Sequence, residues 1–315
     1  MTYFLGIDGG GTKTICAVGN ESQLLATAST GPSNIVRVGE AQTRTSLQQA
    51  VRQACAAAGI APEQVSHTCV GGSGAARPEL AEIVRRILAE ILPSPIDVVG
   101  DMEIALEAAF GDGPGIIVIA GTGSIAFGRD AKGRTARAGG WGFAIGDEGS
   151  AHWIGREAVS AILQASDDAA EPAEKYLQNE FAAAVCKAWG VTSLIDLARV
   201  ANSVPPPDFA ALFPAVAASK DPIAADVCWR AGLELARIGG IVACRLFPPR
   251  ENSSPAKIPV TMTGGVFRHS AVARGDFCND LRRMDPRVEI NPQVVDPVQG
   301  ALRMARRAHA NDIGR

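Results

Sequence analysis

The chain has 315 residues, of which 47% are hydrophobic and 20% charged, and its formal net charge is −3. This composition is typical of a globular protein with a sizeable core, and the length favours two domains. The slightly negative charge argues against binding nucleic acid or an anionic membrane surface, and no apolar run reaches the roughly 18 residues of a membrane span.

The chain opens with two short predicted strands, 3–8 and 14–19, joined by a glycine-rich turn that begins at Asp8. Glycines let backbone N–H groups approach phosphate oxygens without a Cβ in the way. Asp8, at the end of a buried strand, is placed to hold Mg²⁺ through water. The spacing fits neither a Walker A loop nor a dinucleotide fingerprint, because apolar residues follow the turn at strand length. A plain glycine-rich hairpin is the alternative.

Alternating strands and helices follow. Their order, β-β-β-α-β-α-β-α, predicts a mixed sheet with helices on its faces. The elements after the first two strands are a strand at 23–29, a helix at 41–58, a strand at 65–71, a helix at 78–91, a strand at 96–99 and a helix at 102–110.

Asp101 lies between the strand 96–99 and the helix 102–110. In a mixed α/β sheet, ligands bind beyond the carboxyl ends of the strands. A carboxylate there can accept the proton of a hydroxyl group that attacks a phosphorus atom. The alternative is that Asp101 only caps the helix.

The pattern then restarts with a buried strand, 115–120, a second glycine turn, 121–124, and a strand, 125–128. Two such strand–turn–strand units imply two related halves that close around a nucleotide. The remaining predicted elements are helices at 149–166, 172–189, 192–201, 208–218 and 222–247, a strand at 258–263 and a last helix at 297–308.

The loop 139–150 holds five glycines in twelve residues. Trp141 offers a flat apolar face for a sugar ring, and Asp147 offers an acceptor for two neighbouring hydroxyls. The alternative is a hairpin with a core Trp and an Asp that caps the next helix. A further glycine pair, Gly264-Gly265, follows the strand 258–263 and could admit an adenine or a ribose, or be only a turn.

Six segments of the chain, in this order, resemble the N-acetylglucosamine kinases of the BadF/BadG/BcrA/BcrD ATPase family, within the superfamily of sugar kinases, heat-shock chaperones and actin. The resemblance covers nearly the whole chain, and the Trp-Gly-x4-Asp-Glu-Gly-Ser loop is its specific part. The segments are 6–14, 31–34, 121–124, 139–142, 146–150 and 263–266.

The resemblance implies an α/β fold of two actin-like (ribonuclease H-like) lobes with a nucleotide cleft between them. Residues 1–113 and 297–311 would form the N-terminal lobe, and 114–296 the C-terminal lobe with helical additions. It also implies ATP and Mg²⁺ as cofactors and a sugar as substrate, and we expect a homodimer. Because the first residues already form a strand, we expect no leader segment and a cytoplasmic location.

The resemblance also implies roles for individual residues. Asp101 matches the catalytic base and is expected to touch the sugar, although relatives often have a polar residue where Gly100 stands. Asp8 would serve the metal. The ATP contacts would be Gly10, Gly11, Thr12, Lys13 and Thr14 in the first turn, Thr122 and Gly123 in the second, and Gly264 and Gly265 near the adenosine. The other sugar contacts would be Asn34, Ser73, Gly140, Trp141 and Asp147.

These roles predict a kinase that phosphorylates the 6-hydroxyl of N-acetyl-D-glucosamine. Glucosamine is the alternative substrate, but a free ammonium would favour a carboxylate, and the turn 71–76 contains none. An activator of a 2-hydroxyacyl-CoA dehydratase would hold an iron–sulfur cluster between two subunits. None of the seven scattered cysteines lies in a suitable loop, and they are typical of a reducing compartment. A sugar-sensing regulator would need a DNA-binding module before the first strand.

Overall fold

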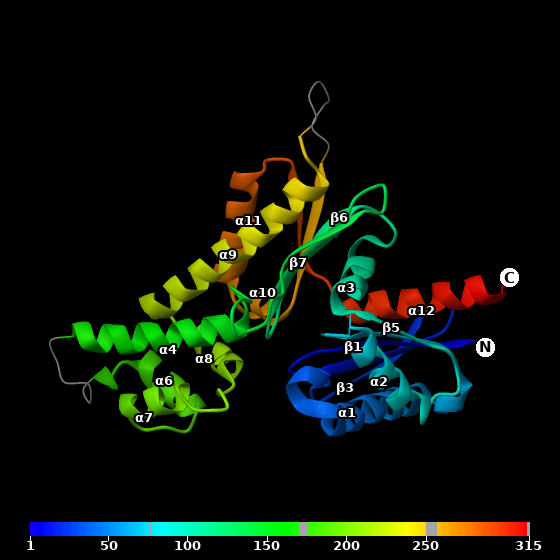
Figure 1. Ribbon diagram of the computed structural model, residues 1–315, viewed down its shortest axis with the longest axis horizontal. Helices are drawn as coiled ribbons and strands as arrows, with labels where there is room; N and C mark the ends of the chain where they lie inside the picture. Colours follow the sequence, from blue (N-terminus) through cyan, green and yellow to red (C-terminus); the bar gives the residue numbers. More distant parts are fainter. Residues whose placement is uncertain (73, 76, 170–175, 250–256, 314–315) are drawn as a thin grey trace. The chain divides into compact units, whose positions relative to one another are not determined.

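The computed structural model describes residues 1–72, 74–75, 77–169, 176–249 and 257–313 (Figure 1). Its chain forms two compact units, which we call unit 1 (Met1–Gly113 with Val295–Arg315) and unit 2 (Pro114–Val294). Within the described residues, no helix combines the length and the apolar character needed to cross a membrane.

Unit 1 is a five-stranded sheet with helices on both faces. Its elements are β1 (Tyr3–Gly9), β2 (Thr14–Gly19), β3 (Leu24–Thr30), α1 (Ile35–Ala58), a 3-10 helix (Pro62–Gln64), β4 (Val65–Gly72), α2 (Pro78–Ala89), β5 (Ile96–Gly100), α3 (Asp101–Phe110) and α12 (Pro297–Ile313). The strand order is β3-β2-β1-β4-β5, with β2 antiparallel to β1 and β3, and with β4 parallel to β1 and β5. The carboxyl ends of β1, β4 and β5 therefore lie at one end of the sheet.

Successive side chains of β1 point to opposite faces of the sheet, so unit 1 has a hydrophobic cluster on each face. Leu5 and Ile7 pack in a cluster with side chains of α1 and α2, whereas Phe4 packs in another cluster with side chains of α3 and α12. This alternation is expected of a strand buried on both sides. The helix α12 thus covers one face of a sheet whose strands all lie between residues 3 and 100.

Two glycines allow α12 to come close to its neighbours. A Cβ on Gly300 would lie 1.9 Å from the carbonyl oxygen of Ile104 in α3. A Cβ on Gly6 would lie 2.4 Å from the backbone nitrogen of Leu302. Both obstacles are backbone atoms, so neither could move aside as a flexible side chain would.

We expect Gly300→Ala to lower the free energy of unfolding by at least about 2 kcal/mol, because α12 would have to move away from α3. The midpoint of urea unfolding, followed by circular dichroism, measures the effect. Gly275→Ala is the matched control, since a Cβ at this exposed glycine of a unit 2 helix meets nothing within 4 Å. It should raise stability by about 0.5–1 kcal/mol. Equal midpoints for the two variants would contradict the close crossing.

Unit 2 repeats the same sheet topology. Its elements are β6 (Gly115–Ala120), β7 (Ser124–Arg129), β8 (Thr135–Gly139), α4 (Ala151–Asp168), α6 (Glu180–Ala188), α7 (Leu194–Ala201), a 3-10 helix (Phe209–Leu212), α8 (Phe213–Ala218), α9 (Pro222–Leu246), β9 (Ile258–Thr263), α10 (Gly265–His269), α11 (Ala271–Met284) and β10 (Val288–Val294). The order β8-β7-β6-β9-β10 has an antiparallel hairpin on one side of β6 and two parallel strands on the other. The predicted α/β fold with two related sheets is confirmed.

Some elements differ from those predicted. The strands β8 and β10 and the helices α10 and α11 were not predicted, and the helix expected at 172–189 is represented by α6, with 170–175 outside the described residues. The helix expected at 41–58 begins earlier, at Ile35. Asn34 caps it there, and the chain bends at Gly39, whose φ is 75°. Between α4 and α9, the short helices α6, α7 and α8 gather beside α4, away from the sheet of unit 2 (Figure 1).

Candidate active site

The first glycine turn is held in place by the segment that leads into α1. The N–H of Gly10 donates to the Lys13 carbonyl (3.0 Å), and the Gly10 carbonyl accepts from the N–H groups of Ser33 (3.1 Å) and Asn34 (3.2 Å). Thr12 and Lys13 are exposed at its tip. The turn is therefore ordered by backbone contacts, while these two predicted ATP ligands face outward.

Thr14 lies inside unit 1 as the first residue of β2. It is fully buried; its hydroxyl donates to the Gly31 carbonyl (2.8 Å), and its Oγ1 lies 2.7 Å from Ser33 Oγ. A Cβ on Gly9 would lie 2.8 Å from the same Ser33 oxygen. The Thr14 side chain thus positions the turn. Sequence reasoning gave no role to Ser33, although it belongs to the segment 31–34 that carries part of the resemblance.

Asn34 is the N-cap of α1. Its Oδ1 accepts from the N–H groups of Val36 (3.1 Å) and Arg37 (3.3 Å). A sugar contact from Asn34 would therefore use its amide nitrogen. Ser73, the predicted contact on the acetyl side, lies outside the described residues.

Asp8 and Asp101 lie at the same end of the unit 1 sheet. Asp8 pairs with Gly71 across β1 and β4, and Gly72 pairs with Gly100 across β4 and β5, so Asp101 follows directly at the carboxyl end of β5. Asp8, near the end of β1, and Asp101, directly after β5, are thus separated by the one strand β4. Ligands of α/β proteins bind at this end of the sheet.

Asp101 does not cap α3, so the capping alternative is wrong. The N-cap is Gly100, whose N–H donates to Glu103 Oε1 (3.1 Å). Asp101 is the first helical residue. Its Oδ1 accepts from the N–H of the next residue, Met102 (2.9 Å). The positive end of the helix dipole favours the ionised carboxylate at this position.

In unit 2, the second glycine turn is joined to the start of α4. The carbonyls of Gly121 and Thr122 accept from the N–H groups of Ala151 (2.8 Å) and His152 (3.4 Å). The hydroxyl of Ser124 donates to the Glu148 carbonyl (2.7 Å). The turn, the end of the loop 139–150 and the first residues of α4 form one hydrogen-bonded assembly.

Asp147 is buried in this assembly. Its side chain accepts from the N–H of Gly142 (3.3 Å), and a Cβ on Gly123 would lie 2.7 Å from its Oδ2. Among the described residues, Asp147 is the one non-glycine residue with a positive φ, 59°. Such a conformation persists where the surroundings impose it, often at functional sites. Ser150, not Asp147, caps α4, since its Oγ accepts from the Trp153 N–H (3.2 Å).

Trp141 is not a core residue. It is 67% exposed, and the guanidinium of Arg137 lies 4.7 Å from the centre of its ring. The alternative of a hairpin built on a buried Trp is therefore wrong. Gly140 precedes it with a φ of 70°, and a Cβ there would lie 2.7 Å from Ile125 Cδ1.

The last predicted glycine pair lies beside the second turn. A Cβ on Gly264, whose φ is 108°, would lie 2.2 Å from the Ala120 carbonyl oxygen and 2.9 Å from the Gly121 nitrogen. A Cβ on Gly265 would meet nothing within 4 Å. Unit 2 therefore brings together the predicted adenosine, phosphate and sugar residues of that half of the chain.

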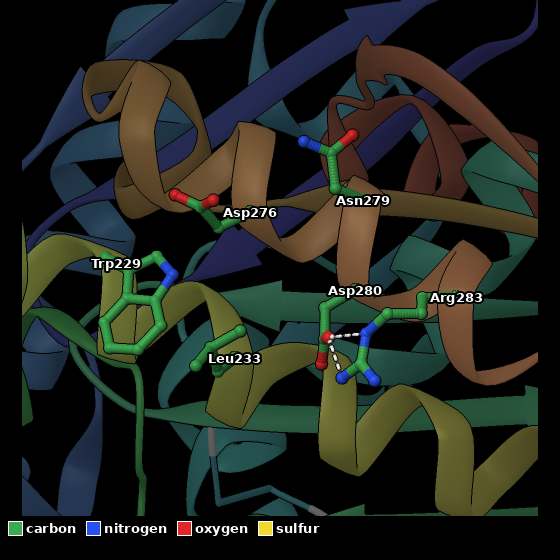
Figure 2. Close-up of a pocket in the computed structure, with 6 residues that line it drawn as sticks. All are labelled: Trp229, Leu233, Asp276, Asn279, Asp280 and Arg283. Atoms are coloured by element: carbon green, nitrogen blue, oxygen red, sulfur yellow. Dashed lines mark hydrogen bonds and ion pairs between the residues drawn. The ribbon is translucent and has the colours of Figure 1, made fainter.

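One pocket in unit 2, of about 350 Å³, is lined by none of these residues. Figure 2 shows that it lies between α9, which contributes Trp229 and Leu233, and α11, whose Asp280 accepts from Arg283 Nε (2.9 Å). A second pocket, of about 270 Å³, does include Trp141.

The cysteines are mostly buried. Cys16, Cys55, Cys69, Cys186 and Cys228 are buried, Cys278 is half-buried and Cys244 is exposed. Burial raises the pKa of the Cys55 thiol to about 11 and that of Cys69 to about 12. These two thiols are therefore unreactive near neutral pH.

Comparison with known proteins supports the resemblance. The family model described as the BadF/BadG/BcrA/BcrD ATPase family matches residues 5–305. The chain is 40% identical over 173 residues to an N-acetylmuramic acid/N-acetylglucosamine kinase of Clostridium acetobutylicum, covering 54% of this chain and 56% of the relative. It is 33% identical over 175 residues to an N-acetyl-D-glucosamine kinase of Dictyostelium discoideum, covering 52% and 55%. The chain spans about half the length of the curated relatives it matches.

A solved structure extends the likeness over the full length. A candidate N-acetylglucosamine kinase from Chromobacterium violaceum superposes with a TM-score of 0.73 at 25% identity, covering 97% of this chain and 99% of that protein. The fold is accordingly that of the actin-like ATPases, with the doubled sheet described above. With a family model that matches residues 5–305 and a fold shared over its length, the chain belongs to the BadF/BadG/BcrA/BcrD ATPase family.

Proposed function

We propose that this protein is an ATP-dependent kinase that phosphorylates the 6-hydroxyl of N-acetyl-D-glucosamine. The observation that carries the proposal is the contact between Gly123, in the second phosphate turn, and the Asp147 carboxylate of the sugar loop. A phosphate group on the turn and a sugar hydroxyl on Asp147 would then be neighbours. The names of the two curated relatives support the same substrate.

The residues of the chain have separable tasks in this reaction. Backbone N–H groups of the two glycine turns bind phosphate oxygens, and Asp147 and Trp141 orient the sugar ring. Asp101 accepts the proton of the 6-hydroxyl as its oxygen attacks the γ-phosphorus. ATP supplies the transferred phosphoryl group. Catalysis then consists mostly of positioning and charge stabilisation.

Asp8 is the residue that fits Mg²⁺. This ion binds beside phosphates through one or two carboxylates and keeps several of its waters. Asp8 offers such a carboxylate at the sheet end that also holds Asp101. A homodimer and a cytoplasmic location, both expected from the sequence, complete the proposal.

A coupled assay of ADP release with purified protein tests the function. The panel contains N-acetylglucosamine, glucosamine, glucose and N-acetylmannosamine, and the position of the new phosphate is read by ³¹P–¹H NMR. The highest kcat/KM is expected for N-acetylglucosamine, with a 6-phosphate as product. ATP hydrolysis that ignores every sugar would instead support an activator of the dehydratase type. A preference for glucosamine would contradict the proposal that the substrate is acetylated, but it would still support a kinase function.

We expect Asp8→Asn to raise the Mg²⁺ concentration for half-maximal activity at least tenfold, because a neutral amide binds this ion poorly. Sugar binding, measured by calorimetry without nucleotide, should stay within twofold. Asp112→Asn, which changes an exposed acid of unit 1 that pairs with Arg307, is the control and should change neither quantity. If Asp8→Asn weakens sugar binding as much as it weakens the response to Mg²⁺, Asp8 supports the fold or binds the sugar instead.

A further inference from the structure

The two sheets have four edge strands, β3 and β5 in unit 1 and β8 and β10 in unit 2. An exposed edge offers backbone N–H and C=O groups to another chain, and proteins protect such edges with charges, prolines or covering side chains. The edge at β5 is protected in this way. Asp97 adds a charge to the strand, and the Ile96 carbonyl accepts from Arg85 Nε (3.2 Å).

Both edges of the unit 2 sheet are protected as well. On β8, Arg137 adds a charge, and its carbonyl accepts from Arg245 Nη1 (2.6 Å). β10 contains Glu289 and Pro292, and a proline has no N–H to offer to a further strand. Each of these three strands is therefore a poor template for pairing with another chain.

The edge strand β3 has none of these protections. It has seven residues, and its sequence, LLATAST, contains no charge and no proline. Among the residues that the structure describes, no side chain hydrogen-bonds to its backbone. Leu24, Leu25 and Thr27 are exposed along it. β3 is thus the edge best suited to accept a further strand.

The flank of α1 beside β3 carries amides instead of charges. The Ser46 carbonyl accepts from the Thr30 hydroxyl (2.8 Å), and Gln42 Nε2 donates to Ser46 Oγ (3.0 Å), so this flank of the helix adjoins the strand. Gln49 and Gln53 are exposed and follow Gln42 at helical spacing on the same side. We call β3 and these three glutamines the β3 surface. It is uncharged in a chain of which 20% is charged.

Ion pairs of α1 lie on its other flank. Arg44 pairs with Glu40 (2.8 Å) and with Glu90, which follows α2. The helix thus directs ion pairs towards α2 and glutamines towards the edge of the sheet. Two independent elements, a strand and a helix flank, therefore leave the same edge of unit 1 uncharged.

We propose that the β3 surface binds a second copy of this chain, with β3 of one protomer antiparallel to β3 of its partner across a two-fold axis at Thr27. The inference rests on the homodimer of the proposed function and assigns its surface. In this register Thr27 faces the partner's Thr27, Ala26 faces the partner's Ala28, and Leu25 faces the partner's Ser29. The two five-stranded sheets of unit 1 become one continuous sheet.

The lack of charge favours a second copy over an unrelated strand. A two-fold axis places the segment opposite itself, so any charge near the axis would meet its like, whereas an uncharged segment meets no repulsion. The axis is perpendicular to the joined sheet, so both α1 helices lie on the same face. Their glutamines then come side by side, and an amide both donates and accepts. A lone peptide strand would make no such helix contact.

Sedimentation velocity tests the surface. Wild type should be a dimer, and Thr27→Lys should raise the dimer dissociation constant at least tenfold, because two lysines would face each other at the axis. Thr135→Lys makes the same change at an exposed threonine of the edge strand β8 and is the matched control. It should leave the dimer unchanged. Thermal unfolding followed by circular dichroism checks that each variant is folded.

A charge swap tests the position of the axis. Thr27→Glu alone should also be monomeric, whereas a mixture of Thr27→Lys and Thr27→Glu should form dimers, because opposite charges then face each other. This rescue requires residue 27 to lie opposite itself. If one of the two variants fails to fold, the dissociation constant of the other decides.

The outcomes separate this inference from the proposed function. A monomeric wild type would overturn both the β3 surface and the homodimer, and it would leave the kinase function to the ADP assay. A dimer that persists in Thr27→Lys, or that weakens equally in Thr135→Lys, would overturn the β3 surface but keep the homodimer. Failure of the mixture to form dimers would overturn the two-fold axis at Thr27.

Discussion

Asp101→Asn is expected to lower kcat by two or more orders of magnitude while the apparent constants for ATP and sugar stay within a few-fold. The amide has nearly the same shape as the carboxylate, and its oxygen can still accept from the Met102 N–H, so the start of α3 is kept. It cannot accept a proton from the sugar hydroxyl, and loss of a general base reduces rates by about 10²–10⁴-fold. Steady-state kinetics over both substrates measures the effect.

Glu103→Gln is the matched control for Asp101. Both acids lie in the first turn of α3, but Glu103 is committed to the N–H of the cap residue Gly100. A glutamine oxygen can accept the same hydrogen bond, so turnover should stay within a few-fold. Near-normal turnover of Asp101→Asn, or an equal loss in Glu103→Gln, would remove Asp101 from the role of base.

Asp147→Asn should raise the KM for N-acetylglucosamine tenfold or more and leave the KM for ATP within a few-fold. A hydrogen bond to a charged acceptor contributes about 1.5–3 kcal/mol, and about 1.4 kcal/mol corresponds to a factor of ten. Asparagine is chosen because it tolerates the left-handed backbone at this position, where φ is 59°. Asp147→Ala would add backbone strain and so mix a loss of stability with the loss of binding.

Gly123→Ala provides an independent check on the same contact. The new methyl group would lie 2.7 Å from Asp147 Oδ2 and would push the carboxylate away from the Gly142 N–H. The KM for the sugar should therefore rise although Asp147 is still present. An unchanged sugar KM in both variants would show that the carboxylate does not bind the substrate.

Much of the fold can be predicted where the sequence is strongly periodic. The helix expected at 222–247 is observed as Pro222–Leu246, with proline in its first turn and a continuous buried face. The missed strands β8 and β10 are edge strands. β8 has five residues, with Arg137 as its one charged residue and no large apolar side chain, and β10 contains Pro292, which a sheet accepts only at its edge. The helix α11 contains Gly275, which weakens helical propensity.

The candidate site shows a different limit. Glycine spacing and acids at strand ends allow the positions of site residues to be predicted from the sequence, because these features reflect local backbone requirements. The partners of Thr14 and Asn34 depend on how distant segments meet: Thr14 contacts Ser33, and Asn34 caps α1 with the oxygen that a ligand could otherwise use. The positive φ of Asp147 and the stacking of Arg137 on Trp141 likewise belong to the folded unit 2 and cannot be read from the local sequence. Tertiary contacts of this kind leave no periodic signal.

The return of α12 to unit 1 determines the order in which the nascent protein can mature on the ribosome. Residues 1–113 are synthesised before unit 2, whereas Val298 and Leu302, which pack in one cluster with Phe4, Cys69 and Ile104, are synthesised after it. Unit 2 is continuous in sequence, so all of its strands are available before α12 is made. Unit 1 thus begins before unit 2 in the chain and is completed after it, unlike domains that fold one after another in N-to-C order.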